Sequence, residues 1–564
     1  MQIVTPKQMA KIENHSEKLG VSKKQLMLNA GKALAKLIEE CSARENSKEQ
    51  PHIVFLAGSG NNGGDCFVAA ELLVYRGFRV TVINLIKAPS AEPAKEMFDK
   101  LPSRVNVITG YKSANEAAAA EAAELDFMTL QDKDLTDISK KKERSPIENI
   151  LLNEKKRLSD IRHAVIDADI LVDGVFGTGF HGKLDKEIMS LFNIGTGAYK
   201  IAVDIPSGGN SNSGTVAKGV FKADETITFG YIKTGMSQFP LKKYCGKITV
   251  ADIGIPRMAI DCIEGERTYY RIERKHLAGF PPKRERDAHK GTFGSVLVIA
   301  GSSSMRGAAA FAALGALRGG AGMVRVASVE KCIDTVSVLA PEATYITLDE
   351  DDYGFMLFDS SKDALLDAME KSDTIVIGCG MGVTNDTAEI VRFVLSNAKV
   401  PVIVDADGIN CIARDINILL NRKSEVIITP HPGEMARLLN CDAAAINDNR
   451  IMTAEKYAEK IGITVVLKGA GTLVADSHKT AANHTGNAGM SRGGSGDILA
   501  GIIGATAAQK YAPFDACCAG VYIHGLAGDA AADKYGQEAM LPRDIISCLP
   551  DAYRILKEKQ LGNI

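Results

Sequence analysis

Short apolar runs alternate with helix-like segments along most of the chain. In the first half, apolar runs predict strands at 53–57, 80–85, 170–172 and 200–203, and helical patterns predict helices at 25–40 and 67–76. In the second half, similar runs predict strands at 295–300, 323–327, 374–377, 400–404, 426–428 and 464–468. Helices are predicted there at 307–318, 387–397, 433–439 and 497–509.

This alternation indicates the fold class. Strands that alternate with helices form parallel sheets whose two faces are both covered. We therefore predict two doubly wound α/β domains, of which the first is a Rossmann-like α/β/α sandwich. Ligands of such sheets bind beyond the carboxyl ends of the strands. The glycine-rich segments of both halves fall at those positions.

The two halves meet in a segment rich in proline and charge. A length of 564 residues suits two to four domains. Pro281 and Pro282 stand among charged residues in the segment 268–288, which is typical of a linker. We predict domains at 1–270 and 271–564. The stretch 112–162 carries an Ala/Glu run and then a lysine cluster, and it predicts solvated helices inside the first domain.

Composition excludes several functional classes. The chain is 45% hydrophobic and 24% charged, as is usual for soluble globular proteins, and its net charge of −2 does not support a nucleic-acid or membrane partner. The first residues lack the apolar core of a signal peptide, and no apolar run reaches the roughly 18 residues of a membrane span. Eleven cysteines without a C-x-x-C pair indicate reduced thiols rather than disulfides or zinc. We expect a cytoplasmic protein.

The most informative segment is the glycine-rich run Gly493–Gly496 with the aspartate that follows it. Small residues leave backbone N–H groups uncovered, and an apolar helix is predicted directly afterwards, so these groups would attract an anion. A carboxylate repels phosphate, so Asp497 makes chemical sense there as a base that deprotonates an attacking hydroxyl. The alternative is that Asp497 only N-caps the helix.

Other segments of the second half share this pattern of small or polar residues after a strand. They are Gly301–Ser304, Gly378–Gly382, Asp405–Asp407, Thr429–Glu434 and Lys468–Thr472. His431 lies between two prolines on the turn after a strand, where contact with a ligand and a satisfied surface histidine remain equally open.

In this order the segments resemble the dehydratase domain of the NAD(P)H-hydrate repair enzymes, a branch of the ribokinase-like superfamily, over residues 272–564. The resemblance implies that the C6 hydroxyl of a hydrated nicotinamide ring is phosphorylated and that phosphate is then eliminated, which restores NADH or NADPH. It implies a catalytic base at Asp497 and substrate contacts at Ala308, Gly382, His431 and Asp497. The implied nucleotide-binding residues are Lys468, Gly469, Ala470, Gly471, Thr472 and Gly496.

The resemblance also concerns the co-substrate. Bacterial members of the family use ADP and eukaryotic members use ATP, so ADP is implied here, and we expect Mg²⁺ with it. Two residues depart from the family pattern. Met305 stands where an aromatic residue is usual, and Cys379 stands where the glycine loop usually has proline. Both departures concern the substrate side more than the nucleotide side.

The first half carries a second glycine-rich loop, Gly58–Asp65, after a predicted strand. The strand–loop–helix order suits a phosphate group, but the loop is neither G-x-G-x-x-G nor a P-loop. Asn61 and Asn62 offer amide oxygens to a hard, weakly held cation, and the alternative is a tight turn stabilised by asparagine. Three further segments with polar groups follow strands, at 173–182, 204–208 and 233–236.

This half resembles the NAD(P)H-hydrate epimerase domain over residues 1–250. The resemblance implies interconversion of the R and S hydrates at C6, acid–base chemistry by Asp204, and a potassium ion held by Asn62, Asp173 and Ser207. The implied substrate-binding residues are Asn61, Asn62, Gly63, Gly64, Asp65, Gly177, Thr178, Gly179, Phe180, His181, Gly182, Lys183 and Asp204. Cys66 replaces the usual glycine after the aspartate, and its side chain would narrow the loop.

The predicted function is therefore a bifunctional metabolite-repair enzyme. The first domain would epimerise hydrated NADH and NADPH (NADHX and NADPHX), and the second would dehydrate the S form at the expense of ADP, giving AMP and phosphate. One alternative is a ribokinase-like kinase for a vitamin or sugar, and another is that the first domain is a binding module without catalysis. We expect NADHX, NADPHX and ADP as partners and a homo-oligomer.

Overall fold

The computed structural model describes residues 2–44, 50–109, 146–195, 197–277 and 279–561. The chain divides into a first compact unit, Ile3–Gly265, and a second unit to which Gln2 and the residues from Glu266 onward belong. We expected the division after residue 270, in a linker at 268–288. It falls earlier because β10 (Thr268–Arg271) pairs with a strand of the second unit. Of the helices predicted within 112–162, the part before residue 146 lies outside the described residues.

The first unit contains a sheet in which all neighbouring strands are parallel. In sheet order its strands are β4 (Asn106–Thr109), β3 (Arg79–Asn84), β2 (His52–Ala57), β5 (Ile170–Gly174), β6 (Tyr199–Val203), β7 (Glu225–Phe229) and β9 (Lys247–Ala251). A short parallel pair is formed by β1 (Gln2–Val4) and β8 (Ile232–Lys233). The helices are α1 (Pro6–Lys18), α2 (Lys23–Arg44), α3 (Asn61–Tyr75), α4 (Ala94–Asp99), α7 (Pro146–Ile166) and α8 (Lys186–Ile194).

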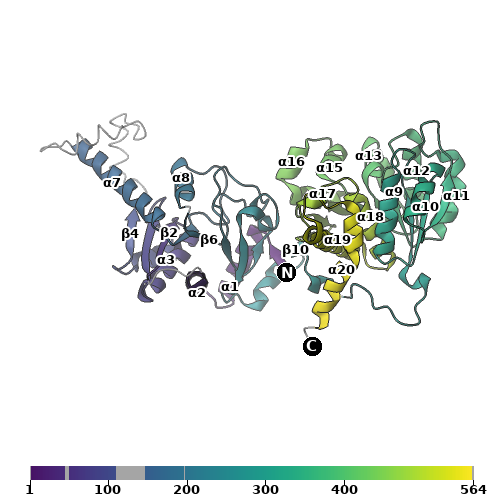
Figure 1. Ribbon diagram of the computed structural model, residues 1–564. Helices are drawn as coiled ribbons and strands as arrows, with labels where there is room; N and C mark the ends of the chain where they lie inside the picture. The colour runs from purple at the N-terminus through teal and green to yellow at the C-terminus, as the bar shows by residue number, and fades with distance from the viewer. Residues whose placement is uncertain (1, 45–49, 110–145, 196, 278, 562–564) are drawn as a thin grey trace. The chain divides into compact units, whose positions relative to one another are not determined.

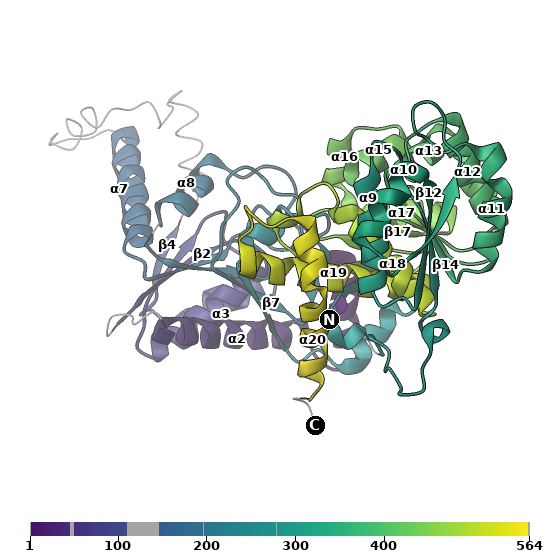
Figure 2. The same ribbon diagram turned by 45° about the vertical axis from the view of Figure 1, so that its right-hand side comes forward.

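Helices cover both faces of this sheet (Figures 1 and 2). Ile53 and Phe55 of β2 pack with α2 and α3, whereas Val54 and Leu56 pack with α7 and α8 on the other face. Burial on both faces is the reason that β2 is an unbroken apolar run rather than an alternating one. The two cores confirm the predicted doubly wound arrangement of this unit.

The second unit is built around a mixed sheet. In sheet order its strands are β13 (Thr344–Leu348), β12 (Met323–Val329), β11 (Ser295–Ile299), β14 (Thr374–Ile377), β15 (Val402–Val404), β16 (Val426–Ile428), β17 (Thr464–Leu467), β18 (Leu473–Ala475), β19 (Lys479–Ala482) and β10. The pairs from β13 to β17 are parallel, and β18 runs antiparallel to both of its neighbours. Every strand predicted for this half is present. The predicted α/β class with parallel sheets is therefore confirmed for both units.

The helices of the second unit surround this sheet (Figure 2). They are α9 (Arg306–Arg318), α10 (Glu330–Leu339), α11 (Phe358–Glu370), α12 (Asn385–Asn397), α13 (Ala406–Arg414), α14 (Asn417–Leu420), α15 (Pro432–Leu439), α16 (Ala443–Asp448), α17 (Arg450–Ile461), α18 (Ser495–Ala508), α19 (Pro513–Tyr535) and α20 (Pro542–Leu561). Short 3₁₀ turns in the two units are η1 (Thr234–Ser237), η2 (Leu241–Tyr244), η3 (Arg257–Ile263), η4 (Arg274–His276), η5 (Lys290–Phe293) and η6 (Ala488–Met490).

Close packing fixes the position of α18, which carries the predicted catalytic aspartate. A Cβ atom on Gly501 would lie 2.1 Å from the backbone oxygen of Ala312 in α9, so only glycine permits this approach. On its other side, α18 packs against β11, β14 and β15. The amino end of α18 is thereby held at the edge of the sheet.

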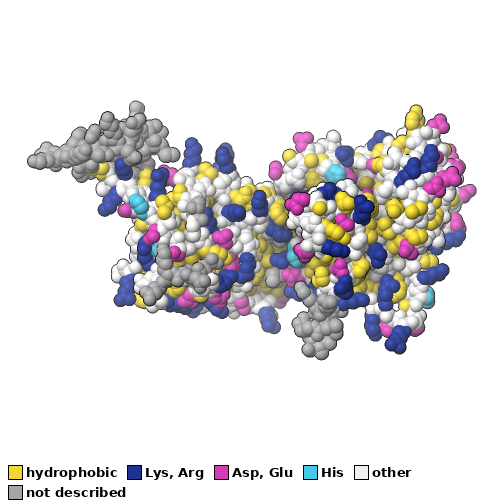
Figure 3. All heavy atoms as spheres, viewed as in Figure 1, with side chains coloured by type: hydrophobic (Ala, Val, Ile, Leu, Met, Phe, Trp, Pro, Cys, Tyr) yellow, Lys and Arg dark blue, Asp and Glu magenta, His cyan; other side chains and the backbone are white. Residues whose placement is uncertain are grey.

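Strand order places a crevice in each sheet. In the first unit β3 and β5 lie on opposite sides of β2, and in the second β12 and β14 lie on opposite sides of β11. Chain connections diverge at such points, and ligands bind there at the carboxyl ends of the strands. Among the described residues, no helix is long and apolar enough to cross a membrane. Basic and acidic side chains are interspersed on the face that Figure 3 shows.

Candidate active sites

The carboxyl ends of the parallel strands bring the predicted segments of the second unit to one edge. Backbone hydrogen bonds link neighbouring segments: Gly301 N donates to Cys379 O at 2.8 Å, and Lys468 N donates to Pro430 O at 2.8 Å. Asp405 follows β15 between them, and its N–H donates to Ile377 O at 3.0 Å. Residues from distant parts of the sequence therefore form one rim.

Asp497 lies in the first turn of α18 but is not its cap. Gly494 is the N-cap, with a φ of 103° that suits glycine, and the helix begins at Ser495, two positions before the prediction. The reading of Asp497 as a cap alone is therefore wrong. The first N–H groups of a helix have no partner within it, so the amino end of α18 can receive an anion.

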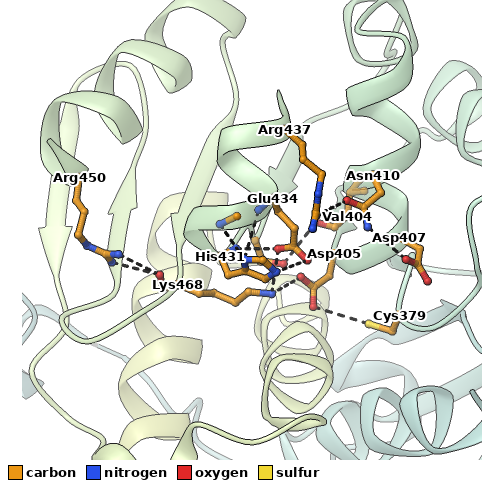
Figure 4. A network of polar contacts seen from close by, with 12 residues as sticks. Cys379, Val404, Asp405, Asp407, Asn410, His431, Glu434, Arg437, Arg450 and Lys468 are labelled. Carbon is orange, nitrogen blue, oxygen red and sulfur yellow. Dashed lines mark hydrogen bonds and ion pairs between the residues drawn. The ribbon is translucent and has the colours of Figure 1, made fainter. Parts of the chain in front are cut away.

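The ammonium group of Lys468 lies beside the carboxylates of Asp405 and Glu434, as Figure 4 shows. Its Nζ lies 2.5 Å from Asp405 Oδ1 and 3.8 Å from Glu434 Oε2. Burial opposes its charge, but the two carboxylates outweigh burial and raise the pKa of Lys468. A Cβ atom on Gly496 would lie 3.3 Å from this Nζ. Lys468 and Gly496, predicted together as nucleotide-binding residues, are thus neighbours.

The carboxyl group of Asp497 lies in a cluster with the thiol of Cys379 and the carboxylate of Asp405. One ligand atom from each lies within 4.8 Å of the others. Burial raises the pKa of Asp497 from 3.8 to about 7, with repulsion from Asp405 acting in the same direction. A hydrogen bond from the Cys379 thiol and the charge of Lys468 oppose the shift. An acid with a pKa near 7 can act as a base at neutral pH.

Arg450 supports the predicted nucleotide loop and was not found from the sequence. Its guanidinium donates to the carbonyl oxygen of Leu467 at 3.1 Å. It also donates to the carbonyl oxygen of Lys468 at 3.3 Å (Figure 4). A Cβ atom on Gly469, whose φ is 140°, would lie 2.8 Å from it. Thr472 closes the loop by donating to Gly469 O at 3.0 Å. No local pattern marks an arginine at the start of a helix as a loop anchor.

The predicted substrate residues of this unit lie on the same rim. His431 caps α15, because its Nδ1 accepts hydrogen bonds from the N–H groups of Gly433 and Glu434 at 3.0 and 3.3 Å. Its side chain is 49% exposed, and its Nε2 lies 3.4 Å from Glu434 Oε1. Gly382 N donates to Asp407 Oδ2 at 2.9 Å. A contact between His431 and a ligand stays a prediction.

Small residues in the segment Gly378–Gly382 allow neighbouring side chains to pack closely against it. A Cβ atom on Gly380 would lie 2.7 Å from the Cβ of Ala308 and 3.0 Å from that of Met305. A Cβ atom on Gly382 would lie 2.4 Å from the ring of Phe355. The sequence did not single out Phe355. It nevertheless supplies an aromatic side chain to the rim at which Met305 replaces the aromatic residue that is usual in the family.

In the first unit, the three predicted potassium ligands meet at the ends of β5 and β6. Asp173 is fully buried and accepts from Ser207 Oγ at 2.6 Å and Ser207 N at 2.7 Å. Asn62 Nδ2 donates to Val203 O at 2.7 Å and Phe176 O at 3.3 Å. Burial raises the pKa of Asp173 to about 6, against the hydrogen bonds from Ser207.

These groups fit a potassium ion. Oxygen atoms dominate the cluster, and the buried Asp173 carboxylate has no cationic partner among the described residues. A hard, weakly held cation is suited to such oxygens. The prediction placed the helix at residue 67, but α3 begins at Asn61, so Asn62 acts from its first turn.

Asp204 is held in an unusual backbone conformation. Its φ is 64°, a left-handed value that is uncommon outside glycine and often marks functional sites. Its Oδ1 accepts from Thr228 Oγ1 at 3.0 Å and forms a close ion pair with Lys233. Lys233 is 1% exposed. It lies in a segment noted from the sequence, but no role was assigned to it.

The remaining predicted residues of this unit lie in α3 and in the loop after β5. Gly63, Gly64 and Asp65 are buried in α3, whereas Asn61 is exposed at its start. In the loop after β5, Gly177, Thr178 and Phe180 are partly buried and Gly179, His181, Gly182 and Lys183 are exposed. The Cys66 thiol packs against Gly174 in the core, where a Cβ atom on that glycine would lie 2.3 Å from it. Cys66 therefore lies beneath the loop.

The amino end of a helix beside a lysine and an aspartate of near-neutral pKa, at the edge of a parallel sheet, is an arrangement suited to phosphoryl transfer in an α/β enzyme. Residues 296–551 match the NAD(P)H-hydrate dehydratase family, and residues 23–235 match the YjeF-related protein N-terminus family.

The chain is also similar over nearly its whole length to bifunctional NAD(P)H-hydrate repair enzymes. It is 32% identical to that of Moorella thermoacetica, over 99% of this chain and 98% of the relative, and 32% identical to that of Escherichia coli, over 94% and 90%. A solved ADP/ATP-dependent NAD(P)H-hydrate dehydratase from Bacillus subtilis, co-crystallized with ATP/Mg²⁺, is 31% identical. It covers 51% of this chain and 98% of that chain with a TM-score of 0.45. The chain belongs to the bifunctional NAD(P)H-hydrate repair enzymes.

Proposed function

We propose how the two units divide the work of this repair enzyme. The first unit is the epimerase, and it interconverts the R and S forms of hydrated NADH and NADPH. The second unit is the dehydratase, and it returns the S form to NADH or NADPH at the expense of ADP, which becomes AMP and phosphate. The observation that carries this division is that each unit holds its own carboxylate at the edge of its sheet, the buried Asp204 in one and the partly buried Asp497 in the other.

In the second unit, Asp497 acts as the general base. It takes the proton of the C6 hydroxyl, whose oxygen attacks the terminal phosphorus of ADP while the bond to the bridging oxygen breaks and AMP leaves. The C6–O bond of the phosphorylated hydrate then breaks as the N1 lone pair assists. Phosphate departs, and loss of a proton from C5 restores the dihydropyridine ring. The N–H groups of α18 and Lys468 offset the negative charge that develops on the transferred group.

Mg²⁺ would enter this site with the nucleotide. The carboxylates of Asp405 and Asp497 offer oxygen donors of the kind that Mg²⁺ prefers. The third member of their cluster is the Cys379 thiol, a soft donor that Mg²⁺ avoids. Most ligands would then come from the phosphates and water, and Mg²⁺ would supply charge neutralisation for phosphoryl transfer. The loop 468–472, supported by Arg450, would hold the rest of the nucleotide.

In the first unit, Asp204 performs acid–base chemistry at the nicotinamide ring, and residues of α3 and of the 177–183 loop surround the hydrate. Asn62, Asp173 and Ser207 would hold a potassium ion, whose charge would offset the buried Asp173 carboxylate and order the ends of β5 and β6. A cytoplasmic location is supported by the eleven cysteines, all unpaired. Self-association stays a prediction that analytical ultracentrifugation would test.

A single time course on the full-length protein tests this division. The mixed R and S hydrates are supplied with ADP, and NADH is followed by its absorbance. The wild-type chain is expected to convert the whole mixture. Asp204→Asn should convert the S fraction quickly and the R fraction only at the spontaneous rate of epimerisation, whereas Asp497→Asn should convert neither. A stable phosphate ester in place of NADH would instead support the kinase alternative. A monophasic course for Asp204→Asn would remove Asp204 from the epimerase.

A further inference from the structure

Asp204 has two further acidic side chains near it, although one carboxyl group would suffice for simple acid–base chemistry. Glu13 of α1, Asp65 of α3 and Asp204 all interact electrostatically with one another and with Lys233 of β8. The ammonium group of Lys233 is committed to Asp204 Oδ1, Thr228 Oγ1 at 3.0 Å and Phe229 O at 3.3 Å. One cation thus neutralises one carboxylate, and the other two acids have no such partner in this cluster.

Asp65 is the deeper of these two acids. Asp65 is only 6% exposed. In the described part of the chain, no hydrogen bond or ion pair is formed by its carboxyl group. Burial raises the pKa of Asp65 well above 3.8, and the charges of Asp204 and Glu13 add to this shift while Lys233 opposes it. An acid buried without a partner destabilises a fold. Its presence therefore requires a functional reason.

The backbone places Asp65 on the same side as Asp204. Asn62 Nδ2 donates to Val203 O at 2.7 Å, which ties the first turn of α3 to the residue directly before Asp204. Residues three apart on a helix lie on one face, so Asp65 follows Asn62 on the face that looks toward the end of β6. Asp65 and Asp204 therefore come from different elements but lie on the same side, near the carboxyl end of β6.

Asp204 is arranged differently from Asp65. Thr228 Oγ1, Phe229 N and Lys233 Nζ all donate to its Oδ1. In the described residues no donor reaches Oδ2, which leaves that oxygen for the substrate. Asp204 is thus a fixed carboxylate beside a cation, whereas Asp65 is a carboxyl group in surroundings that favour its neutral form.

We infer that Asp65 is a second catalytic residue of the first unit, which acts as the acid while Asp204 acts as the base. The inference rests on the epimerase function proposed above. Asp65 gives its proton to the C6 hydroxyl, the C6–O bond breaks, water leaves, and the N1 lone pair forms the N1=C6 bond. A water molecule then adds to the other face of C6, the N1=C6 electron pair returns to N1, and Asp204 Oδ2 takes the proton of the added water. Exchange with solvent returns the proton to Asp65.

Glu13 has a different part in this cluster. It is only partly buried, and Lys23 also lies near enough to lower the pKa of its carboxyl group, against burial and Asp204. Its charge raises the pKa of Asp65. Glu13 is therefore a positioning residue that helps Asp65 to keep its proton, and it does not itself give a proton to the substrate.

The test measures R-to-S epimerisation by the full-length protein across pH, with the spontaneous rate subtracted. Because Asp65 must hold a proton, the wild-type rate is expected to fall as pH rises through its pKa. Asp65→Asn should slow epimerisation by about 10²-fold or more, as loss of a general acid does, and remove this fall. Glu13→Gln should move the fall to lower pH, because Asp65 then loses the neighbouring charge that raises its pKa. Asp261→Asn, at an exposed aspartate of the same unit, is the matched control and should change neither rate nor profile.

Two further measurements distinguish an error in the role of Asp65 from an error in the water-loss route or in the epimerase function itself. Asp65→Glu keeps an acid at a shifted position, and it should retain the fall with pH at a reduced rate even if Asp65→Asn disturbs folding. Wild-type epimerisation in H₂¹⁸O should place the label in the C6 hydroxyl. Epimerisation by Asp65→Asn within threefold of wild type, with an unchanged pH profile, would overturn the role of Asp65 alone. Absence of the label would overturn the water-loss route, and a wild-type chain without epimerase activity would overturn the proposed function itself.

Discussion

The raised pKa of Asp497 links catalysis to stability, and the substitution Asp497→Asn separates the two effects. Asparagine keeps the size of the side chain but carries no charge. If Asp497 is the base on the C6 hydroxyl, dehydration of the S hydrate should fall by a factor of about 10²–10⁴. The same substitution should stabilise the folded protein at pH 8, since the wild-type fold must hold an ionised carboxylate at a site where burial and Asp405 oppose it.

The size of this stabilisation follows from the pKa shift. The folded-state pKa of Asp497 is raised from 3.8 to about 7, so the stability that the protonated group gives is fully present below pH 3.8 and is lost as pH rises toward 7. The full shift corresponds to about 4 kcal/mol, which is an upper estimate for a partly buried group. Asp497→Asn should therefore raise the unfolding free energy by up to about 4 kcal/mol at pH 8, about 2 kcal/mol at pH 5.5 and nothing below pH 4.

Denaturant unfolding of the full-length protein at these pH values, followed by circular dichroism, measures the effect. Asp352→Asn, at an exposed aspartate in a loop of the same unit, is the control and should leave stability and activity unchanged. Wild-type dehydration should itself rise with pH around a midpoint near 7. Two results would refute the reasoning: dehydration by Asp497→Asn within threefold of wild type, or a stability change that does not depend on pH.

Three other predictions concern separate parts of the chain. Epimerisation should be faster in potassium than in a bulky organic cation, and Asn62→Ala or Ser207→Ala should abolish that difference; equal rates in both salts would remove the potassium site. Arg450→Gln should raise the KM for ADP about tenfold with little change in kcat, because the loop loses an anchor at Lys468 O rather than a catalytic group, and a fall in kcat alone would contradict this. Fragments divided between Gly265 and Glu266 should each fold and melt cooperatively, and two unfolded fragments would show that the division is wrong.

Much of the fold could be predicted because parallel strands leave a strong local signal. A strand buried on both faces is a continuous apolar run, and β2, β5, β11, β14 and β17 were each found in this way. Boundaries were less accurate. The proline- and charge-rich surroundings of β10 predict a linker, whereas pairing with β19 makes β10 part of the sheet. The starts of α3 and α18 were placed too late, since glycine-rich residues disguise a first helical turn.

The sequence by itself determined the order of the strands and helices, the glycine-rich turns and the residues that could carry chemistry. Only the tertiary structure decided which of them act together. Lys468 meets Asp405 across 63 residues, and Lys233 meets Asp204 across 29. Such contacts follow from which strands lie side by side, and a local pattern cannot encode that order. The pKa of Asp497 likewise depends on burial by neighbours that are distant in sequence, so its near-neutral value exists only in the folded protein.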